Sequence, residues 1–338
     1  MKNGDGSFSG GPMYYIEKGL GLRPLAVLYA ALAALSVLSM GNMSQINGSV
    51  AAIAAAVGEF VPLSPGESFR LKLFAGLILA LVSALILAGD VKRVGRVTSL
   101  LVPFMSLAFL LITFTVILRN VHRLPACLGA VIEGAFRPEA LFGAAGGLTM
   151  KEALHWGVRR GAFSNEAGLG FAAIAHAPSD DGRPAEQGLW GIFEVFADTI
   201  VICSATALAI LTSGVPVPWG SAPGPELLQA AFSSVFGGKA SSLFMSGSLF
   251  LFSFSTVIGC SVFGIRCAEY VFGGSAGGPY RLLFSLCTFL GSIMSTGFIW
   301  AAADIINALM SLPNFLALLL MSGLIGRESR KYFSLKSG

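Results

Sequence analysis

Charge is scarce in this 338-residue chain: Asp, Glu, Lys and Arg together make up 12% of it, whereas 54% is hydrophobic. Soluble domains average about 25% charged residues. Several long windows hold no charge at all, namely residues 73–89, 97–118, 240–265, 282–303 and 305–326. A soluble core would need several long helices without a polar face, which argues against a soluble protein. The scarcity of charge therefore predicts helices that cross a bilayer.

The chain also lacks the residue patterns of several function classes. Its five cysteines are scattered without a Cys-x-x-Cys pair, and its three histidines have no partner at ligand spacing. We therefore expect neither disulfides nor a bound metal or cofactor. The net charge of +4 forms no patch for nucleic acid. There is no phosphate-binding loop, dinucleotide fingerprint or nucleophile elbow, so we do not expect an enzyme.

We predict an all-α polytopic membrane protein with about eight transmembrane helices, because each apolar window supplies the ~20 residues that one span needs. The expected spans lie near residues 25–50, 71–89, 97–118, 146–177 (interrupted), 188–213, 242–266, 281–301 and 304–326. Residues 24–326 would form the transmembrane domain. Residues 1–23 are expected to be a cytoplasmic polar segment, without the apolar stretch of a signal peptide. Residues 327–338 are expected to be a cytoplasmic basic tail.

Basic residues at the ends of the spans predict the orientation. Lys92, Arg93 and Arg96 share one short loop, and four more basic residues lie between 327 and 336. The positive-inside rule places both groups in the cytoplasm. The chain is thus expected in the cell membrane, plasma or inner, with its C-terminus in the cytoplasm. The arginines of loop 119–141 fit this orientation badly, but that loop is apolar enough to form an interfacial helix.

The expected fourth span carries the most unusual polar segment, Gly161-Ala-Phe-Ser-Asn-Glu-Ala-Gly-Leu-Gly170. Two glycines within three residues weaken a helix, and a broken helix at membrane depth is tolerated where it lines a cavity or is buried in protein. Amides freed at such a break bind carboxylates, and freed carbonyls bind cations. Glu166 fits a coupling-ion ligand, but we favour a structural partner for Arg159 or Arg160. An ordinary loop between two shorter helices is the alternative for the whole segment.

Three other spans carry polar residues of two possible uses. Asn42 and Gln45 of the first span share a helical face, where they would either line a pore or join helices by hydrogen bonds. Asp198 lies four residues after Glu194, well inside the fifth span. It would bind an ion or proton, or anchor two helices, and we slightly favour the anchor.

In the sixth span, Ser255 and Thr256 offer the hydroxyl oxygens that an alkali cation prefers, with Cys260 one turn later. Close helix packing is the alternative use of these small residues. In the eighth span, Asp304, Asn307 and Asn314 with Pro313 suggest a bent helix.

Five blocks of this sequence resemble the alanine or glycine:cation symporter family, also called the sodium:alanine symporters or AGCS family. The blocks are Gly10-Gly-Pro-Met-Tyr-Tyr-Ile-Glu-Lys-Gly19, Gly41-Asn-Met-Ser-Gln45, Trp156-Gly-Val-Arg-Arg-Gly-Ala-Phe-Ser-Asn-Glu-Ala-Gly-Leu-Gly170, Asp198-Thr-Ile-Val-Ile-Cys203 and Ser255-Thr-Val-Ile-Gly259. The third block is long and specific, and the resemblance runs from about Gly4 to the C-terminus.

The resemblance implies a LeuT-type inverted-repeat fold and sodium-coupled symport of small neutral amino acids, chiefly alanine and glycine, by alternating access. Asn42 and Gln45 would line the substrate site, and Ser164, Asn165 and Gly168 would present unwound backbone to it. Thr256 would contact substrate or, with Ser255, stand near a sodium ion. Proton coupling in place of sodium stays open, with Asp198 as the residue to examine.

The sequence departs from the family in two ways. Family members have about three spans before the first block, including a broken helix that contributes to substrate and sodium binding, so we expect an incomplete first repeat here. This keeps open a non-transporting remnant or an assembly partner; an intramembrane enzyme using Glu166 or Asp198 ranks last, because it lacks a nucleophile. The family also commonly has Trp at the position of Cys260. A smaller pocket wall there would admit side chains larger than alanine.

Overall fold

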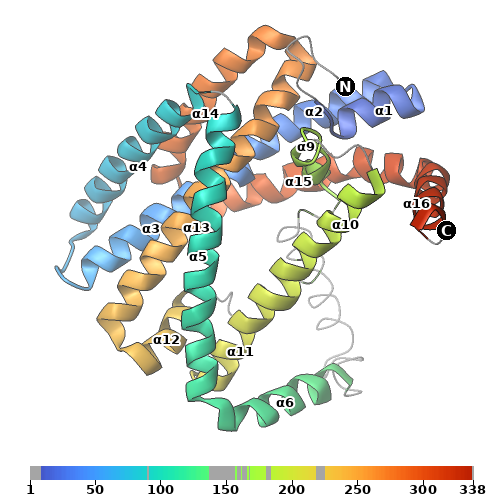
Figure 1. The fold of residues 1–338 in the computed structure, drawn as a ribbon. Helices are drawn as coiled ribbons and strands as arrows, with labels where there is room; N and C mark the ends of the chain where they lie inside the picture. Colours follow the sequence, from blue (N-terminus) through green and yellow to red (C-terminus); the bar gives the residue numbers. More distant parts are fainter. Residues whose placement is uncertain are drawn as a thin grey trace, which may run out of the picture.

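A computed structural model describes residues 9–89, 91–136, 157, 161, 166, 168–179, 184–217 and 225–336, and these residues form helices joined by turns, without strands. Two π-helical turns (η1 and η3) and two short 3₁₀ turns (η2 and η4) join the α-helices (Figure 1). In chain order, the elements are α1 Pro12–Leu20, α2 Arg23–Leu38, η1 Ser39–Met43, α3 Ser44–Gly58, α4 Pro65–Leu87, α5 Val91–Arg119, η2 Val121–Arg123, α6 Leu124–Phe136, α9 Phe171–Ala175, α10 Pro184–Val195, η3 Phe196–Cys203, α11 Ser204–Ser213, α12 Pro225–Phe236, α13 Gly238–Phe272, η4 Gly274–Ala276, α14 Gly277–Ile293, α15 Thr296–Leu320 and α16 Ser322–Lys336.

The first expected span is one long helix from Arg23 to Gly58, made of α2, η1 and α3. The polar motif Gly41-Asn-Met-Ser-Gln45 does not break this helix. Instead, the amide of Ser44 donates to the carbonyl of Ser39, five residues earlier, so the motif forms a π-helical turn. Such single π turns are frequent at functional sites, because the extra residue shifts the direction in which side chains point.

Helix α13 is the central element of the bundle, and two hydrophobic cores form along it (Figure 1). On one side it packs against α2 and α3, where fully buried residues include Tyr29, Ile46 and Ile258. On the other side it packs against α5 and α12, around Phe109 and Phe232, whose ring centroids lie 6.1 Å apart. Burial of these large side chains on both sides stabilises the position of α13.

Helices α14 and α15 both pack against the long first helix, and α14 also packs against α4. The boundary between α14 and α15 differs from the one expected from the sequence. The spans expected at residues 281–301 and 304–326 are instead α14, which ends at Ile293, and α15, which begins at Thr296. The backbone is extended at Met294 and Ser295. No Gly or Pro lies within the linker itself, and the weak signals beside it are Gly291, Gly297 and Ser295, which is the N-cap residue of α15.

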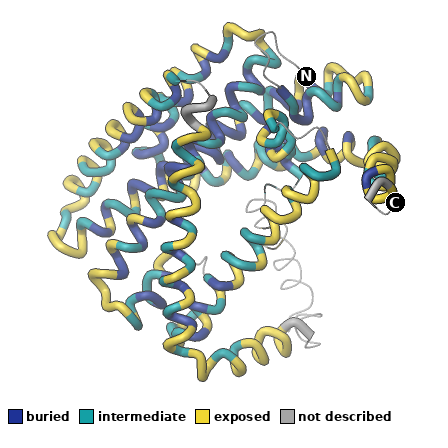
Figure 2. Tube along the Cα trace, in the orientation of Figure 1, coloured by how far each residue is buried: buried dark blue, intermediate teal, exposed yellow. Residues whose placement is uncertain are grey.

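Six of the described helices are long and apolar enough to cross a membrane, among them α4, α13 and α15. Of the other two expected spans, α14 has only 17 residues. Most of residues 146–177 lies outside the described part of the chain, which there includes the short helix α9. The count of about eight spans therefore stays a prediction. Figure 2 shows that α4, α5 and α10 carry many exposed positions, and large apolar residues such as Phe74, Phe104 and Phe193 are among them. Apolar side chains on an outer surface suit contact with lipid.

Two segments outside the long spans are helical as well. The end of the expected polar segment forms α1, whose Met13 and Ile16 are fully buried against the bundle. The loop that we expected to hold an interfacial helix contains α6. Just before α6, Arg123 donates a 3.1 Å hydrogen bond to the carbonyl of Ser213, at the C-terminal end of α11. A cation is stabilised at a helix C-terminus. Arg123, whose position did not agree with the orientation predicted from the basic residues, therefore stabilises the end of α11.

The contact between α14 and η1 provides a stability test. A Cβ atom on Gly291 would lie 2.7 Å from the Cα of Met43, so the two backbones approach too closely for any side chain. We expect Gly291→Ala to lower the free energy of unfolding by about 1–3 kcal/mol through overpacking. Thermal unfolding of the detergent-solubilised protein measures it. Gly297→Ala is the matched control, because a Cβ at this exposed position of α15 meets nothing. An equal effect of the two substitutions would contradict the close approach.

Candidate substrate and ion site

The polar segment of the fourth expected span is a true break in helical backbone where it is described. Glu166, Gly168 and Gly170 have positive φ angles of 49°, 78° and 87°. The amide of Leu169 closes a turn onto the carbonyl of Glu166 at 3.0 Å, and α9 begins directly after Gly170. A positive φ at a residue other than glycine is uncommon and concentrates at functional sites. Ser164 and Asn165 lie outside the described residues, as do Arg159 and Arg160.

The two carbonyls freed by this break accept hydrogen bonds from side chains of other helices. Asn314 of α15 donates through Nδ2 to the carbonyl of Gly168 at 2.8 Å. Tyr29 of α2 donates its hydroxyl to the carbonyl of Leu169 at 2.6 Å. Both side chains are buried. Because an unpaired backbone group in an apolar surrounding costs several kcal/mol, these two bonds make the break tolerable.

The two glycines of the break are also required by space. A Cβ on Gly168 would lie 2.1 Å from the ring of Phe315, and one on Gly170 would lie 2.3 Å from Pro12. The break is thus inserted between α1, α2 and α15 with no room for a side chain at either glycine. Glycine therefore meets two demands here, a left-handed backbone and a close approach.

The first family-like block lies beside this break. Tyr15 of α1 donates its hydroxyl to Oδ1 of Asn314, and burial raises the pKa of this tyrosine, so that it remains a neutral donor. The neighbouring Tyr14 packs edge-on against Tyr270, whose hydroxyl donates to Glu17 at 2.6 Å. Blocks about 150 positions apart in sequence, one near residue 15 and one near residue 168, therefore meet in the fold.

Asn42 of η1 joins helices in this conformation. It is fully buried, its Nδ2 donates to the carbonyl of Phe284 at 2.7 Å, and its Oδ1 accepts from Thr288 at 3.0 Å. Of the two uses that the sequence left open for Asn42, the structure contains the interhelical hydrogen bonds. An amide has two N–H groups and two lone pairs, so one of each remains for another partner.

Gln45 and Cys260 lie in different surroundings. Gln45 is half-buried, and its Nε2 reaches only the carbonyl of Met40 on its own helix, at 3.5 Å. Cys260 is buried and packs against Gly41: a Cβ there would lie 2.8 Å from the Cβ of Cys260. The second block thus touches α13 at the position where the family commonly has Trp.

Asn47 is a functional candidate that sequence reasoning did not single out. Its Nδ2 donates to the carbonyls of Gly291 and Met294, both at 2.9 Å, and its Oδ1 accepts from Thr296 at 2.7 Å. It therefore connects the end of α14, the extended linker and the start of α15. The available signal was its helical spacing of five from Asn42, which a π turn brings closer to one face.

The hydroxyls expected near a sodium ion bond within their own helix. Ser255 and Thr256 both donate to the carbonyl of Phe252, at 2.8 and 2.9 Å. Ser255 is buried beside Met105 of α5, whereas Thr256 is half-buried. A hydroxyl that donates in this way keeps lone pairs, so both oxygens could still bind a cation.

The carboxylates lie in different surroundings. Glu166 belongs to the break beside α1, α2 and α15. Asp198 is half-buried in η3, and the helix that continues from η3 packs against α5 and α12. Glu194, one turn before Asp198, lies 3.3 Å from Nε2 of His176. In the described part of the chain, no group of three His, Cys, Asp or Glu residues could hold a metal ion.

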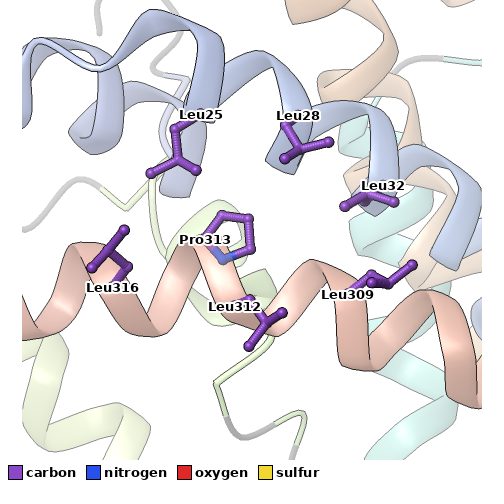
Figure 3. A pocket seen from close by; sticks show the side chains of 7 residues that line it. All are labelled: Leu25, Leu28, Leu32, Leu309, Leu312, Pro313 and Leu316. Atoms are coloured by element: carbon purple, nitrogen blue, oxygen red, sulfur yellow. The ribbon is translucent and has the colours of Figure 1, made fainter.

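A separate groove runs between α2 and α15 (Figure 3), with a cavity volume of about 330 Å³. Its lining consists of Leu25, Leu28, Leu32, Leu309, Leu312, Pro313 and Leu316. A zwitterionic amino acid needs polar partners for its ammonium and carboxylate groups. This lining offers only apolar side chains, so it suits hydrocarbon and is no substrate site.

The comparison with known families agrees with the arrangement of these blocks. The model of the sodium:alanine symporter family matches residues 1–337. The chain belongs to this family. The family resemblance stated from the sequence is thus confirmed. The sodium:alanine symporters are membrane transporters, and membership indicates amino acids and sodium as cargo.

Relatives within the sodium:alanine symporter family align with nearly the whole chain. An uncharacterized transporter of Haemophilus influenzae is 34% identical, over 98% of this chain and 71% of that protein. The sodium/alanine symporter AgcS of Methanococcus maripaludis is 35% identical, over 97% and 70%. A Bacillus subtilis protein named "Probable sodium/glutamine symporter GlnT" is 34% identical, over 96% and 65%.

Removal of the side-chain hydrogen bonds of Asn47 is expected to lower the stability of this protein substantially. Asn47→Ala leaves one buried carbonyl, one partly buried carbonyl and one partly buried hydroxyl without their partner, and a fully buried group of this kind costs about 1–3 kcal/mol. We expect the free energy of unfolding to fall by about 2–4 kcal/mol, measured by thermal unfolding in detergent. Ser44→Ala is the control: Ser44 is buried too, but its hydroxyl bonds only to Met40 of its own helix. A control that loses as much would contradict a special role for Asn47.

Proposed function

We propose that this chain is a sodium-coupled symporter of small neutral amino acids, of the alanine and glycine class, which works by alternating access in a LeuT-type fold. The observation that carries the proposal is the broken backbone at Glu166, Gly168 and Gly170, which lies half-buried among α1, α2 and α15 in a member of the sodium:alanine symporter family. A packed bundle that only had to be stable would have no use for such a break. A transporter needs freed amides and carbonyls to bind the charged ends of an amino acid.

The substrate would be recognised through its ammonium and carboxylate groups. Freed backbone at Ser164, Asn165 and Gly168 is proposed to bind one charged end, since amides at a half-helix start attract carboxylates. Asn42 and Gln45 are proposed to contribute amide groups from η1 and α3. Asn42 is fully buried in this conformation, so a substrate reaches it only after a rearrangement, as alternating access requires.

Sodium is proposed to bind oxygen atoms of α13, at Ser255 and Thr256. A hard alkali cation prefers hydroxyl and carbonyl oxygens, and both hydroxyls keep lone pairs for it. Glu166 is proposed as a second candidate ligand. The relatives named as sodium/alanine and sodium/glutamine symporters support sodium as the coupling ion.

Uptake of radiolabelled alanine into proteoliposomes tests this proposal. We expect uptake that depends on an inward sodium gradient and that stops when potassium replaces sodium on both sides. Uptake driven equally well by a proton gradient without sodium would contradict sodium coupling. Absence of any uptake by the folded protein would instead make the chain a non-transporting member of its family.

The substrate range follows from Cys260, which packs against Gly41 where the family commonly has Trp. An indole would fill ~150–250 Å² of apolar surface that cysteine leaves free. We expect serine, cysteine and larger neutral amino acids to compete with labelled alanine better than glycine does. Cys260→Trp is expected to shift the preference back toward glycine by about tenfold, since a few methylenes in a pocket are worth ~1–3 kcal/mol. If serine, cysteine and larger amino acids never compete better than glycine, the hypothesis that Cys260 enlarges the substrate pocket is wrong.

Asp198 separates sodium coupling from proton coupling. We expect Asp198→Asn to keep sodium-dependent uptake, with the KM for sodium within about a factor of two of the original. The reason is that η3, which contains Asp198, packs mainly on α10 and α11 rather than on α13, where sodium is proposed to bind. Uptake measured against sodium concentration checks this. Loss of the sodium dependence in a folded variant would make Asp198 an ion ligand.

A further inference from the structure

We infer that Asn314 is a positioning residue for the amino-acid site, which fixes the carbonyl of Gly168 and thereby the orientation of the broken backbone. This inference rests on the proposed function, because it assigns a task within the proposed substrate site. Asn314 belongs to α15, more than one hundred residues after the break, and is 1% exposed.

The hydrogen bonds of Asn314 leave its amide one orientation. The hydroxyl of Tyr15 lies at one end of the amide, where the amide oxygen accepts its hydrogen bond. The other end then carries the NH₂ group, and it lies 2.8 Å from the carbonyl of Gly168. A backbone carbonyl only accepts hydrogen bonds, so the opposite orientation would set two acceptors against each other. The carbonyl of Gly168 thus fixes the orientation of the amide, and the hydroxyl of Tyr15 holds that orientation by donating to the amide oxygen. Asn314 in turn holds the peptide after Gly168.

Packing makes this contact specific rather than adaptable. Phe315, the next residue of α15, fills the space beside Gly168, and Pro12 fills the space beside Gly170. Tyr29 holds the following carbonyl at Leu169. The break therefore cannot shift to another donor without moving α1, α2 or α15. Amides on the same peptides face away from these carbonyls, so fixing the carbonyls also fixes the direction in which the amides point.

Asn307 provides a matched comparison on the same helix. It lies seven residues before Asn314, two helical turns, and it is also bonded to the long first helix. Ser36 donates to its Oδ1 at 2.5 Å, and its Nδ2 lies 2.8 Å from the sulfur of Met40. It contacts no part of the break through these bonds. A substitution there tests packing between α15 and α2 without touching Gly168.

The first experiment measures backbone amide hydrogen exchange in peptides that cover residues 168–177 of the whole protein in detergent. In Asn314→Asp, an ionised carboxylate faces the carbonyl of Gly168 and cannot donate to it. We expect exchange in this segment to rise about tenfold over the unsubstituted protein, with no comparable rise in Asn307→Asp. On acidification from about pH 8 to about pH 5, the protonated carboxyl can donate again, and the excess should disappear.

Each value is taken as a ratio to the unsubstituted protein at the same pH. The ratio removes the effect on exchange of other titratable groups, because both proteins contain them. The titratable groups around the contact are Tyr15, Tyr29, Glu166 and Cys267. Should Asn314→Asp fail to fold, Tyr15→Phe removes only the orienting hydroxyl, and we expect a smaller rise in the same peptides. Unchanged exchange in both variants, or an equal rise in Asn307→Asp, would overturn the inference.

The second experiment measures alanine uptake. We expect the KM for alanine to rise about tenfold in Asn314→Asp near neutral pH and to return toward the original value on acidification, with Asn307→Asp unchanged. A pH-dependent KM is not expected of a substitution that only weakens packing. If the unsubstituted protein shows no uptake, the proposed function fails, whereas the exchange experiment still decides whether Asn314 positions the break.

Discussion

Every polar backbone group that a helix break releases in this protein needs a hydrogen-bond partner, because hydrocarbon supplies none. The structure meets this demand with side-chain amides and hydroxyls from other helices. Asn314 and Tyr29 bind the carbonyls of Gly168 and Leu169, and Asn47 binds those of Gly291 and Met294. The positions of α1, α2 and α15 follow from these few contacts. A helix that packs against a break must present a hydrogen-bond donor to the freed carbonyls. This requirement restricts which helices can pack there.

The long first helix is the frame on which these contacts depend. Its π-helical turn contains Asn42, and the residues around the turn bond to α14 and α15 at successive levels. Close approach makes these bonds short enough, with Gly291 against Met43 and Gly41 against Cys260. In lipid, helices gain little from excluding water, so small residues and side-chain hydrogen bonds provide much of the specific association. The same features that join the helices also surround the proposed substrate site.

Much of the architecture could be predicted from composition and spacing. The apolar windows gave the long helices, with the fifth expected span ending at Ser213 as observed. The glycines at 168 and 170 correctly indicated a break in the backbone. The boundary between α14 and α15 could not be predicted, because no Gly or Pro stands at Met294 and the extended linker depends on Asn47 from a distant helix. Likewise, the sequence placed Asn314 only in a bent helix, since its partners are 146 and 299 residues away.

The sequence by itself determined the class of this protein: the scarcity of charge requires a membrane-spanning bundle, and five short blocks place it with the sodium:alanine symporters. These properties are local, so they can be read from neighbouring residues. Only the tertiary structure decided which polar residues hold the bundle together and which remain for a ligand. Asn42 and Asn314 have the same side chain in similar apolar surroundings, yet one binds a helix carbonyl and the other binds the break. That difference arises from the packing of distant helices, because a hydrogen bond depends on atoms within about 3 Å and not on separation along the chain.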